Sequence, residues 1–214
     1  METIDLIHTL ARDTKPARRL QRPSVRFAVW AAVSLVIVLA WVLVLGSRPD
    51  LSPKLGDLRF LTESLLLLAG GVVAALVSLV VSIPDSDRKP ALKFSALFPM
   101  VGWFTLLLAV LIHGLMHGEA NALSAGLGIG CIRDILLIGG GPALFLFYLV
   151  RRASPTEPAL TGALVLISMA CIGALGTQFL CKNDRALHLM VWHFLPIAIL
   201  ALTGIPLGRR FLRW

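Results

Sequence analysis

Charged residues are scarce in this sequence: they make up 15% of its 214 residues, whereas hydrophobic residues make up 57%. A soluble domain of this size needs a charged shell over its whole surface. Here the charges fall in short clusters between apolar stretches of about 20 residues, the length a helix needs to cross the hydrocarbon core of a bilayer. The scarcity of charge therefore excludes a soluble globular domain and indicates an integral membrane protein.

The common catalytic motifs are also missing. The sequence has no HExxH, no GxSxG, no P-loop and no glycine-rich dinucleotide turn, so we expect neither an enzyme nor a resident cofactor. It has no CxxC either, which leaves a membrane thiol oxidoreductase as a weak alternative. No cleavable signal peptide is visible, because a polar, arginine-rich segment of about 25 residues precedes the first apolar run.

Six apolar runs are expected to be transmembrane helices. They cover Phe27–Gly46, Phe60–Ile83, Ala96–Met116, Gly128–Val150, Ala159–Leu180 and Leu187–Leu207. Runs of this length lack the alternation of barrel strands, and a helix satisfies its own backbone hydrogen bonds in lipid. We predict an all-α integral membrane protein. Its six-helix transmembrane bundle spans residues 27–208, between an amphipathic and basic segment, 1–26, and a basic tail, 209–214.

Lys and Arg residues are distributed unequally between the two sides of such a bundle. One side holds fourteen of the 20: Arg12, Lys15, Arg18, Arg19, Arg22, Arg26, Arg88, Lys89, Lys93, Arg151, Arg152, Arg209, Arg210 and Arg213. The other side holds Arg48, Lys54, Arg59, Arg133, Lys182 and Arg185. The positive-inside rule makes the first side, with both termini, cytoplasmic. The net charge of +8 is thus a signal of orientation, and we expect no direct contact with nucleic acid.

Two of the three cysteines lie at the borders of spans. Cys131 begins the fourth span and Cys181 ends the fifth, so both are expected at the outer face, where thiols can be oxidised. Cys171 lies about 15 Å deeper on its helix and is expected to be a packing residue. We interpret Cys131 and Cys181 as a redox-sensing or metal-sensing pair. The alternatives are a structural disulfide or two unrelated interfacial residues.

Histidines near the same face raise the possibility of a metal site. His113 and His117 are four residues apart, so they share a helix face, and His188 opens the sixth span. Together with the two outer thiols they would suit a zinc, cadmium or copper ion, held transiently. Each histidine could equally be an ordinary interfacial residue. His193 lies deeper and could be an interior residue with satisfied hydrogen bonds.

Acidic side chains inside spans are costly and often functional. Glu63 and Asp134 lie within the first two turns of their spans, near Arg59 and Arg133, which favours local ion pairs over a proton or ligand role. A small transporter or channel is the competing function class. It would require Glu63, Asp134 and His193 to line one water-filled path near the midplane.

The N-terminal segment, "METIDLIHTLARDTKPARRLQRPSVR", has two halves. Apolar residues recur at helical spacing in the first half, at Ile4, Leu6, Ile7 and Leu10. A helix this short is not stable alone, so it is expected to bury its apolar face in a partner's groove, on the membrane or on the bundle. The second half, which includes Arg18 and Arg19, is an anchor for anionic lipids.

Two stretches resemble one family. The head "DLIHTLARDTKPARRLQRPSVR", followed by six spans, and the late stretch "CKNDRALHLMVWHFLP" are similar to the NrsF-type bacterial membrane anti-sigma factors. The most specific parts are the pattern "DLI..LA.D..P.RRL..P..R" and the pattern "C......HL..WH.LP". The head departs from the family pattern mildly, at Ala17 and Gln21.

The resemblance implies a regulator in the bacterial inner membrane. The cytoplasmic N-terminal segment would hold an extracytoplasmic-function sigma factor away from core polymerase. Paired outer-face cysteines, which correspond here to Cys131 and Cys181, would sense heavy metal or oxidative stress and cause its release.

Overall fold

The computed structural model describes residues 3–13, 20–83, 90–119 and 121–213, and every regular element within them is a helix. Six helices are long and apolar enough to cross a membrane. They are α2 (Pro23–Leu45), α4 (Leu58–Val81), α6 (Leu97–Met116), α7 (Ile129–Arg151), α8 (Pro158–Gln178) and a continuous run of α9 (Ala186–Leu189), the π-helical turn η2 (Met190–Phe194) and α10 (Leu195–Phe211). The prediction of six helical spans is confirmed, and the boundaries shift by about four residues at most.

Local sequence signals begin several of these helices. Proline stands in the first turn of α2 and α8, at Pro23 and Pro158, where its missing N–H costs no hydrogen bond. The Asp57 carboxylate accepts the backbone N–H of Arg59 at 3.0 Å, which caps the start of α4. These signals sit in the polar loops, so each span starts close to the edge of its apolar run.

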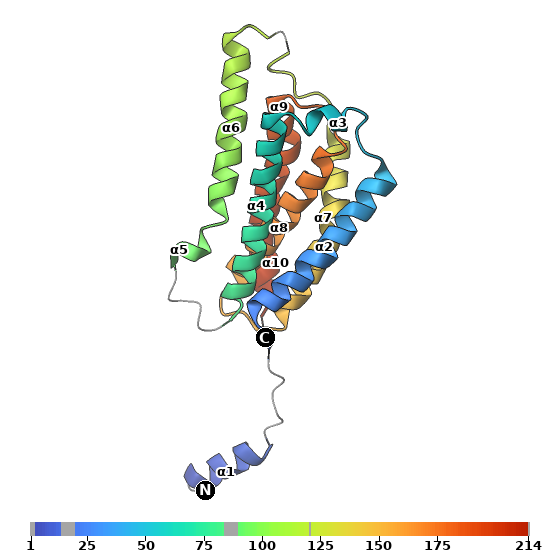
Figure 1. Ribbon diagram of the computed structural model, residues 1–214. Helices are drawn as coiled ribbons and strands as arrows, with labels where there is room; N and C mark the ends of the chain where they lie inside the picture. Colours follow the sequence, from blue (N-terminus) through green and yellow to red (C-terminus); the bar gives the residue numbers. More distant parts are fainter. Residues whose placement is uncertain (1–2, 14–19, 84–89, 120, 214) are drawn as a thin grey trace.

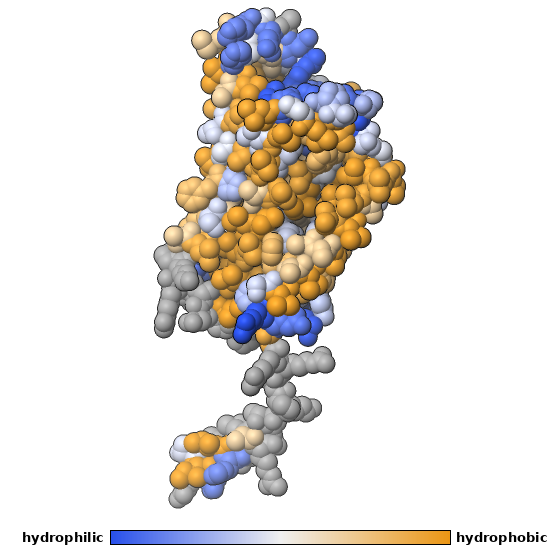
Figure 2. Space-filling view, in the orientation of Figure 1, coloured by the Kyte–Doolittle hydropathy of each residue, from blue (hydrophilic) through white to orange (hydrophobic). Residues whose placement is uncertain are grey.

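Helix α8 forms the centre of the bundle. It is apolar on all sides, as expected for a helix with no lipid-facing stripe, and it contacts α4, α7 and α10. Figure 1 shows α8 behind α4, with α2 and α6 on the periphery. Figure 2 shows that hydrophobic residues cover the middle of the bundle and that hydrophilic ones gather at both ends, as a bilayer requires.

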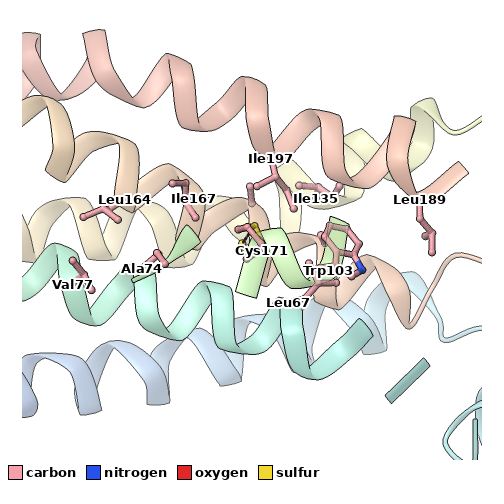
Figure 3. Close-up of a cluster of buried hydrophobic side chains, with 14 of the residues drawn as sticks. Leu67, Ala74, Val77, Trp103, Ile135, Leu164, Ile167, Cys171, Leu189 and Ile197 are labelled. Carbon is pink, nitrogen blue, oxygen red and sulfur yellow. Dashed lines mark hydrogen bonds between the residues drawn. The ribbon is translucent and has the colours of Figure 1, made fainter. Parts of the chain in front are cut away.

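The main buried cluster lies between α4, α6, α8 and α10 (Figure 3). Cys171 is part of it: its thiol is fully buried and lies 3.5 Å from the sulfur of Met100. Leu67 and Trp103 surround it from α4 and α6. Cys171 is therefore a packing residue, far from any polar surface, as the sequence predicted.

Glycines allow α8 to approach its neighbours closely. A Cβ atom on Gly162 would lie 2.6 Å from the Cα atom of Gly208 on α10, and one on Gly173 would overlap the backbone of Ile135 on α7. Helices in lipid associate by van der Waals packing, which small residues at the crossing point make possible. Helix α7 also runs unbroken through Pro142.

Gly162→Ala is expected to lower the stability of the bundle by about 1–3 kcal/mol, because the added methyl group must push apart two helix backbones. Gly140→Ala is the matched control, since nothing lies within 4 Å of its Cβ position. Unfolding of both variants in detergent micelles measures the difference. Equal stability of the two variants would contradict the close packing of α8 on α10.

The bundle has two chemically different ends. We call the end that holds Cys131, Cys181 and the short helix α3 (Leu51–Lys54) the cysteine end. The opposite end, which we call the basic end, holds the start of α2, the α7–α8 connection with Arg151 and Arg152, and the end of α10 with Arg209 and Arg210. The start of α2 and the end of α10 lie side by side at this end in Figure 1.

Two further helices lie on the basic side. Helix α5 (Pro90–Lys93) precedes α6, and Lys93 forms an ion pair with Glu157. Helix α1 (Thr3–Asp13) confirms the helix predicted in the head and is set apart from the bundle in Figure 1. Ile4 and Ile7 expose 63% and 59% of their surface. The side chains of Leu6 and Leu10, together with all of Arg18 and Arg19, lie outside the described residues.

Candidate functional site

Cys131 and Cys181 come together at the cysteine end from different elements. Cys131 lies in the first turn of α7, and Cys181 follows α8, its backbone N–H donating to Thr177 O at 2.8 Å. The two sulfur atoms are 3.6 Å apart, and both half-buried thiols are free. A disulfide bond is about 2.05 Å long. The two sulfurs are therefore not bonded here, but a shift of about 1.5 Å would bring them to the length of a disulfide.

His188 on α9 lies against both thiols. Its Nε2 atom is 3.6 Å from the sulfur of Cys131 and 3.4 Å from that of Cys181. Its Nδ1 atom is 2.7 Å from the carbonyl oxygen of Ala125. A carbonyl only accepts hydrogen bonds, so Nδ1 carries the proton and the Nε2 lone pair faces the thiols. This second hydrogen bond fixes both the tautomer and the ring orientation.

His193 is the fourth member of the group. Ligand atoms of Cys131, Cys181, His188 and His193 all lie within 4.8 Å of one another. His193 is fully buried, and neither of its ring nitrogens has a hydrogen-bond partner. The expectation of a satisfied interior histidine therefore depends on the neighbouring Cys181 thiol, which interacts with this ring. A buried imidazole without partners is costly, and the groups that it faces are the thiols.

A π-helical turn places His193 beside His188. Residues five apart on an α-helix point about 140° away from each other. In η2 the backbone N–H of Leu195 bonds to the Met190 carbonyl, five residues back, and this wider turn brings the two histidines toward one side, with ring centroids 5.7 Å apart. Single π-helical turns are frequent at functional sites.

His113 and His117 lie elsewhere. They are at the end of α6, where their rings stack on each other with centroids 4.1 Å apart. His117 Nδ1 also contacts the His113 carbonyl at 2.9 Å. The structure therefore brings together three of the five residues predicted to bind metal, Cys131, Cys181 and His188, and adds His193 in place of the α6 pair.

The segment that precedes α7 is tied to the π-helical turn. The indole N–H of Trp192 donates to Gly126 O at 2.9 Å. Gly126 has φ +61°, in the left-handed region that favours glycine. A Cβ atom on Gly128 would overlap the Trp192 ring. These contacts fix the start of α7, and hence Cys131, relative to the two histidines.

An ion-pair cluster holds the loop that carries Cys181. The buried guanidinium of Arg48 donates to Asp50 at 2.7 and 2.8 Å and to Asp184 at 2.7 and 2.9 Å. Lys54 also pairs with Asp184 at 2.8 Å, and the Arg48 backbone N–H donates to Phe179 O at 2.9 Å. The α2–α4 loop and the α8–α9 loop are thereby joined.

The charges of this cluster support one another. Hydrogen bonds from Arg48 hold the pKa of Asp50 at about 2. Burial alone would raise the pKa of Asp184, but its hydrogen bonds to Arg48 and Lys54 lower it below the ordinary value. The two carboxylates raise the pKa of Arg48 in turn, mainly through hydrogen bonds. The cluster therefore stays fully ionised at neutral pH.

Glu63 and Asp134 form local pairs. The buried carboxylate of Glu63 accepts from Arg59 Nε at 2.8 Å and from Gln178 Nε2 at 3.0 Å. Asp134 pairs with its neighbour Arg133 at 2.8 Å. Each carboxylate thus has its own arginine at the cysteine end, as predicted.

A cavity of about 990 Å³ opens beside the thiols. Cys131, Cys181 and His188 line it, together with polar residues of the surrounding loops such as Glu119 and Asn183. A small solute from this face can therefore reach the sulfur atoms directly. The hydrogen bond from the Cys131 thiol lowers the pKa of Cys181, which favours the thiolate, the form that binds metals and attacks oxidants.

Comparison with known proteins identifies the family. The family model for NrsF, described as negative regulator of sigma F, matches residues 10–214, nearly the whole chain. The chain belongs to the NrsF family. No curated protein and no solved structure matches it. NrsF membership makes this chain a negative regulator of a sigma factor, as the sequence patterns implied, and a regulator rather than a known kind of enzyme.

One residue of the candidate site was not assigned to it from sequence. His193 lies within the stretch "HLMVWH", which also carries part of the family resemblance, but its greater depth in the span favoured an interior residue. Only the π-helical turn brings the two rings toward one side. Two histidines five residues apart near the start of a span could have indicated a shared site. They share a helix face only if the helix contains a π-helical turn.

Proposed function

We propose that this NrsF protein is an inner-membrane anti-sigma factor that binds an extracytoplasmic-function sigma factor through its N-terminal segment. Helix α1 supports this role. It precedes the first span, and Ile4 and Ile7 are exposed on it. An amphipathic helix with an uncovered apolar face is a common ligand for a hydrophobic groove on a partner protein.

The distribution of charge supports the orientation. The basic end carries most of the Lys and Arg residues, so the positive-inside rule puts it in the cytoplasm, where sigma factors meet polymerase. Arg22, Arg209 and Arg210 are exposed at that end, within reach of anionic lipid headgroups. The cysteine end then faces the periplasm.

The observation that carries the sensory part of the proposal is the 3.6 Å approach of the Cys131 and Cys181 sulfur atoms beside an open cavity. Two chemistries fit this geometry. A peroxide can take two electrons and two protons from the pair, which forms the S–S bond and leaves two waters, or one water and an alcohol if the peroxide is organic. A thiophilic heavy-metal ion can instead replace the two protons and bind both sulfurs.

Helix α7 offers a route from the cysteine end to the head. Cys131 lies at its start, and near its other end the Leu149 carbonyl accepts a hydrogen bond from Arg26, which is buried in the first turn of α2. Trp30 Nε1 also donates to Pro142 O at 3.1 Å. A shift of α7 would thus move the base of α2, from which the head extends. Release of the sigma factor requires that its binding free energy differ by a few kcal/mol between two states of the bundle.

The holding role is tested with the double variant Ile4→Asp and Ile7→Asp in the full chain. Charges on the apolar face of α1 are expected to lower the amount of sigma factor that co-purifies by at least about tenfold, which corresponds to about 1.4 kcal/mol. Transcription from sigma-dependent promoters should then be high without stress. Ile4 and Ile7 are exposed, so the bundle should still fold.

Leu123→Asp is the matched control, because Leu123 is also exposed, at 69%, but lies in the connection between α6 and α7. It should leave binding unchanged. If the sigma factor remains bound to the double variant at the level of the unmodified chain, the interface lies outside α1 and the holding role of this helix is wrong.

A further inference from the structure

The spacing of three ligand atoms at the cysteine end is that of a tetrahedral metal site. A tetrahedral zinc ion with Zn–S bonds of about 2.3 Å and Zn–N bonds of about 2.05 Å separates two sulfurs by about 3.8 Å and a sulfur from a nitrogen by about 3.6 Å. Here the sulfurs are 3.6 Å apart, and His188 Nε2 lies 3.6 and 3.4 Å from them. Three corners are in place.

His193 supplies the fourth candidate ligand. It is fully buried, its two ring nitrogens have no hydrogen-bond partner, and one of them lies within 4.8 Å of the other three ligand atoms. A metal ion at the centre of the group would give this imidazole a ligand bond, where the protein itself offers the Cys181 thiol as a neighbour. The two histidines at the end of α6 are exposed, so water can satisfy their ring nitrogens.

We propose that Cys131, Cys181, His188 and His193 form a tetrahedral site for a divalent ion of the zinc group, such as Zn²⁺ or Cd²⁺. This inference rests on the proposed sensory function and names its ligand set. Two thiolate and two imidazole ligands suit a borderline or soft d¹⁰ ion and disfavour the hard ions Mg²⁺ and Ca²⁺. Two thiolates balance the charge of a divalent ion, so the loaded site is neutral.

The residues around the four ligands hold them in place as in known metal sites. His188 donates its other ring N–H to Ala125 O, the usual outer contact of a metal-binding histidine. The four ligands come from the start of α7, the α8–α9 loop, α9 and the π-helical turn. An ion that draws them together would fix the angle between α7 and the last span, which is the mechanical change that a sensor of this design requires.

The purified, reduced full chain in detergent tests the site. Co²⁺ should bind one per chain with the strong visible absorption of tetrahedral cobalt and a thiolate charge-transfer band, and Zn²⁺ or Cd²⁺ should displace it. X-ray absorption of the Zn²⁺ form should give two sulfur and two imidazole neighbours. Absence of binding, or a spectrum with one imidazole, would overturn the four-ligand site.

His193→Ala should raise the dissociation constant for Zn²⁺ by about tenfold or more, in keeping with the loss of a partner at a metal site, while His113→Ala should leave it unchanged. Because His193 is buried, His193→Cys provides a second variant. It should retain tetrahedral binding with a stronger thiolate band. If all three variants bind Zn²⁺ equally, His193 is not a ligand.

Binding and regulation can fail separately. If the purified chain binds Zn²⁺ as described but the cysteine variants still respond to metal in cells, the site stands and the proposed sensory function is wrong. If the response in cells requires the cysteines but the purified chain binds no ion, the site is wrong and disulfide formation carries the signal.

Discussion

Replacing Cys131, Cys181 or both with Ser is expected to abolish the rise in sigma-dependent transcription that heavy metal or oxidant causes. Serine preserves the size of each side chain but can neither form a disulfide nor bind a soft ion as a thiolate does. Each single variant should fail as completely as the double variant, because either chemistry needs both sulfur atoms. A transcriptional reporter in cells with and without stress measures the effect.

Cys171→Ala is the matched control for this prediction. Cys171 is fully buried among apolar side chains in the middle of the bundle, so its replacement should preserve induction at a modest cost in stability. Full induction in the Cys131→Ser and Cys181→Ser variants would refute the sensor role of the pair. It would leave membership of the NrsF family untouched.

Arg48→Met is expected to cause the largest loss of stability at the cysteine end. The Arg48 side chain is 1% exposed and binds the carboxylates of Asp50 and Asp184. Removal of one partner from a buried ion pair costs about 3–5 kcal/mol. We expect about 3 kcal/mol here, since Asp50 and Asp184 are 45% and 29% exposed and water compensates in part.

The same variant should weaken sensing, because Asp184 anchors the loop that carries Cys181. Arg133→Met is the control: its side chain is 66% exposed and its partner is a neighbour in sequence, so it should change stability by about half a kcal/mol at most. Unfolding in detergent and the rate of Cys131–Cys181 disulfide formation measure both effects. Equal stability of the two variants would contradict the role of Arg48.

The six spans were predictable because the bilayer imposes one local rule. A run of about 20 apolar residues must be helical in lipid, and proline or aspartate at its border sets where the helix begins. The predicted boundaries for α7, Gly128–Val150, and the observed ones, Ile129–Arg151, differ by one residue at each end. The arrangement of the six helices in the bundle could not be predicted from the sequence, because every span is apolar. The central position of α8 depends on how closely its backbone crosses those of its neighbours.

The thiol pair shows which features follow from sequence rules and which follow from helix packing. Counting Lys and Arg puts Cys131 and Cys181 on one side of the membrane, and depth along the helix separates Cys171 from them. Their 3.6 Å approach does not follow from either rule. It depends on how α7 crosses α8, where the glycine contact at Gly173 permits the two backbones to come close.

The sequence by itself thus determined the membrane class, the number of spans and the amphipathic head, because each depends on residues close together in the chain. It also put two cysteines on one face, because the charges of the loops set the orientation of every span. Only the tertiary structure decided which histidines join the thiols. It excluded His113 and His117 from the cluster and brought in His193. The physical reason is the π-helical turn, which rotates His193 toward His188 and in which Trp192 packs against Gly128 at the start of α7.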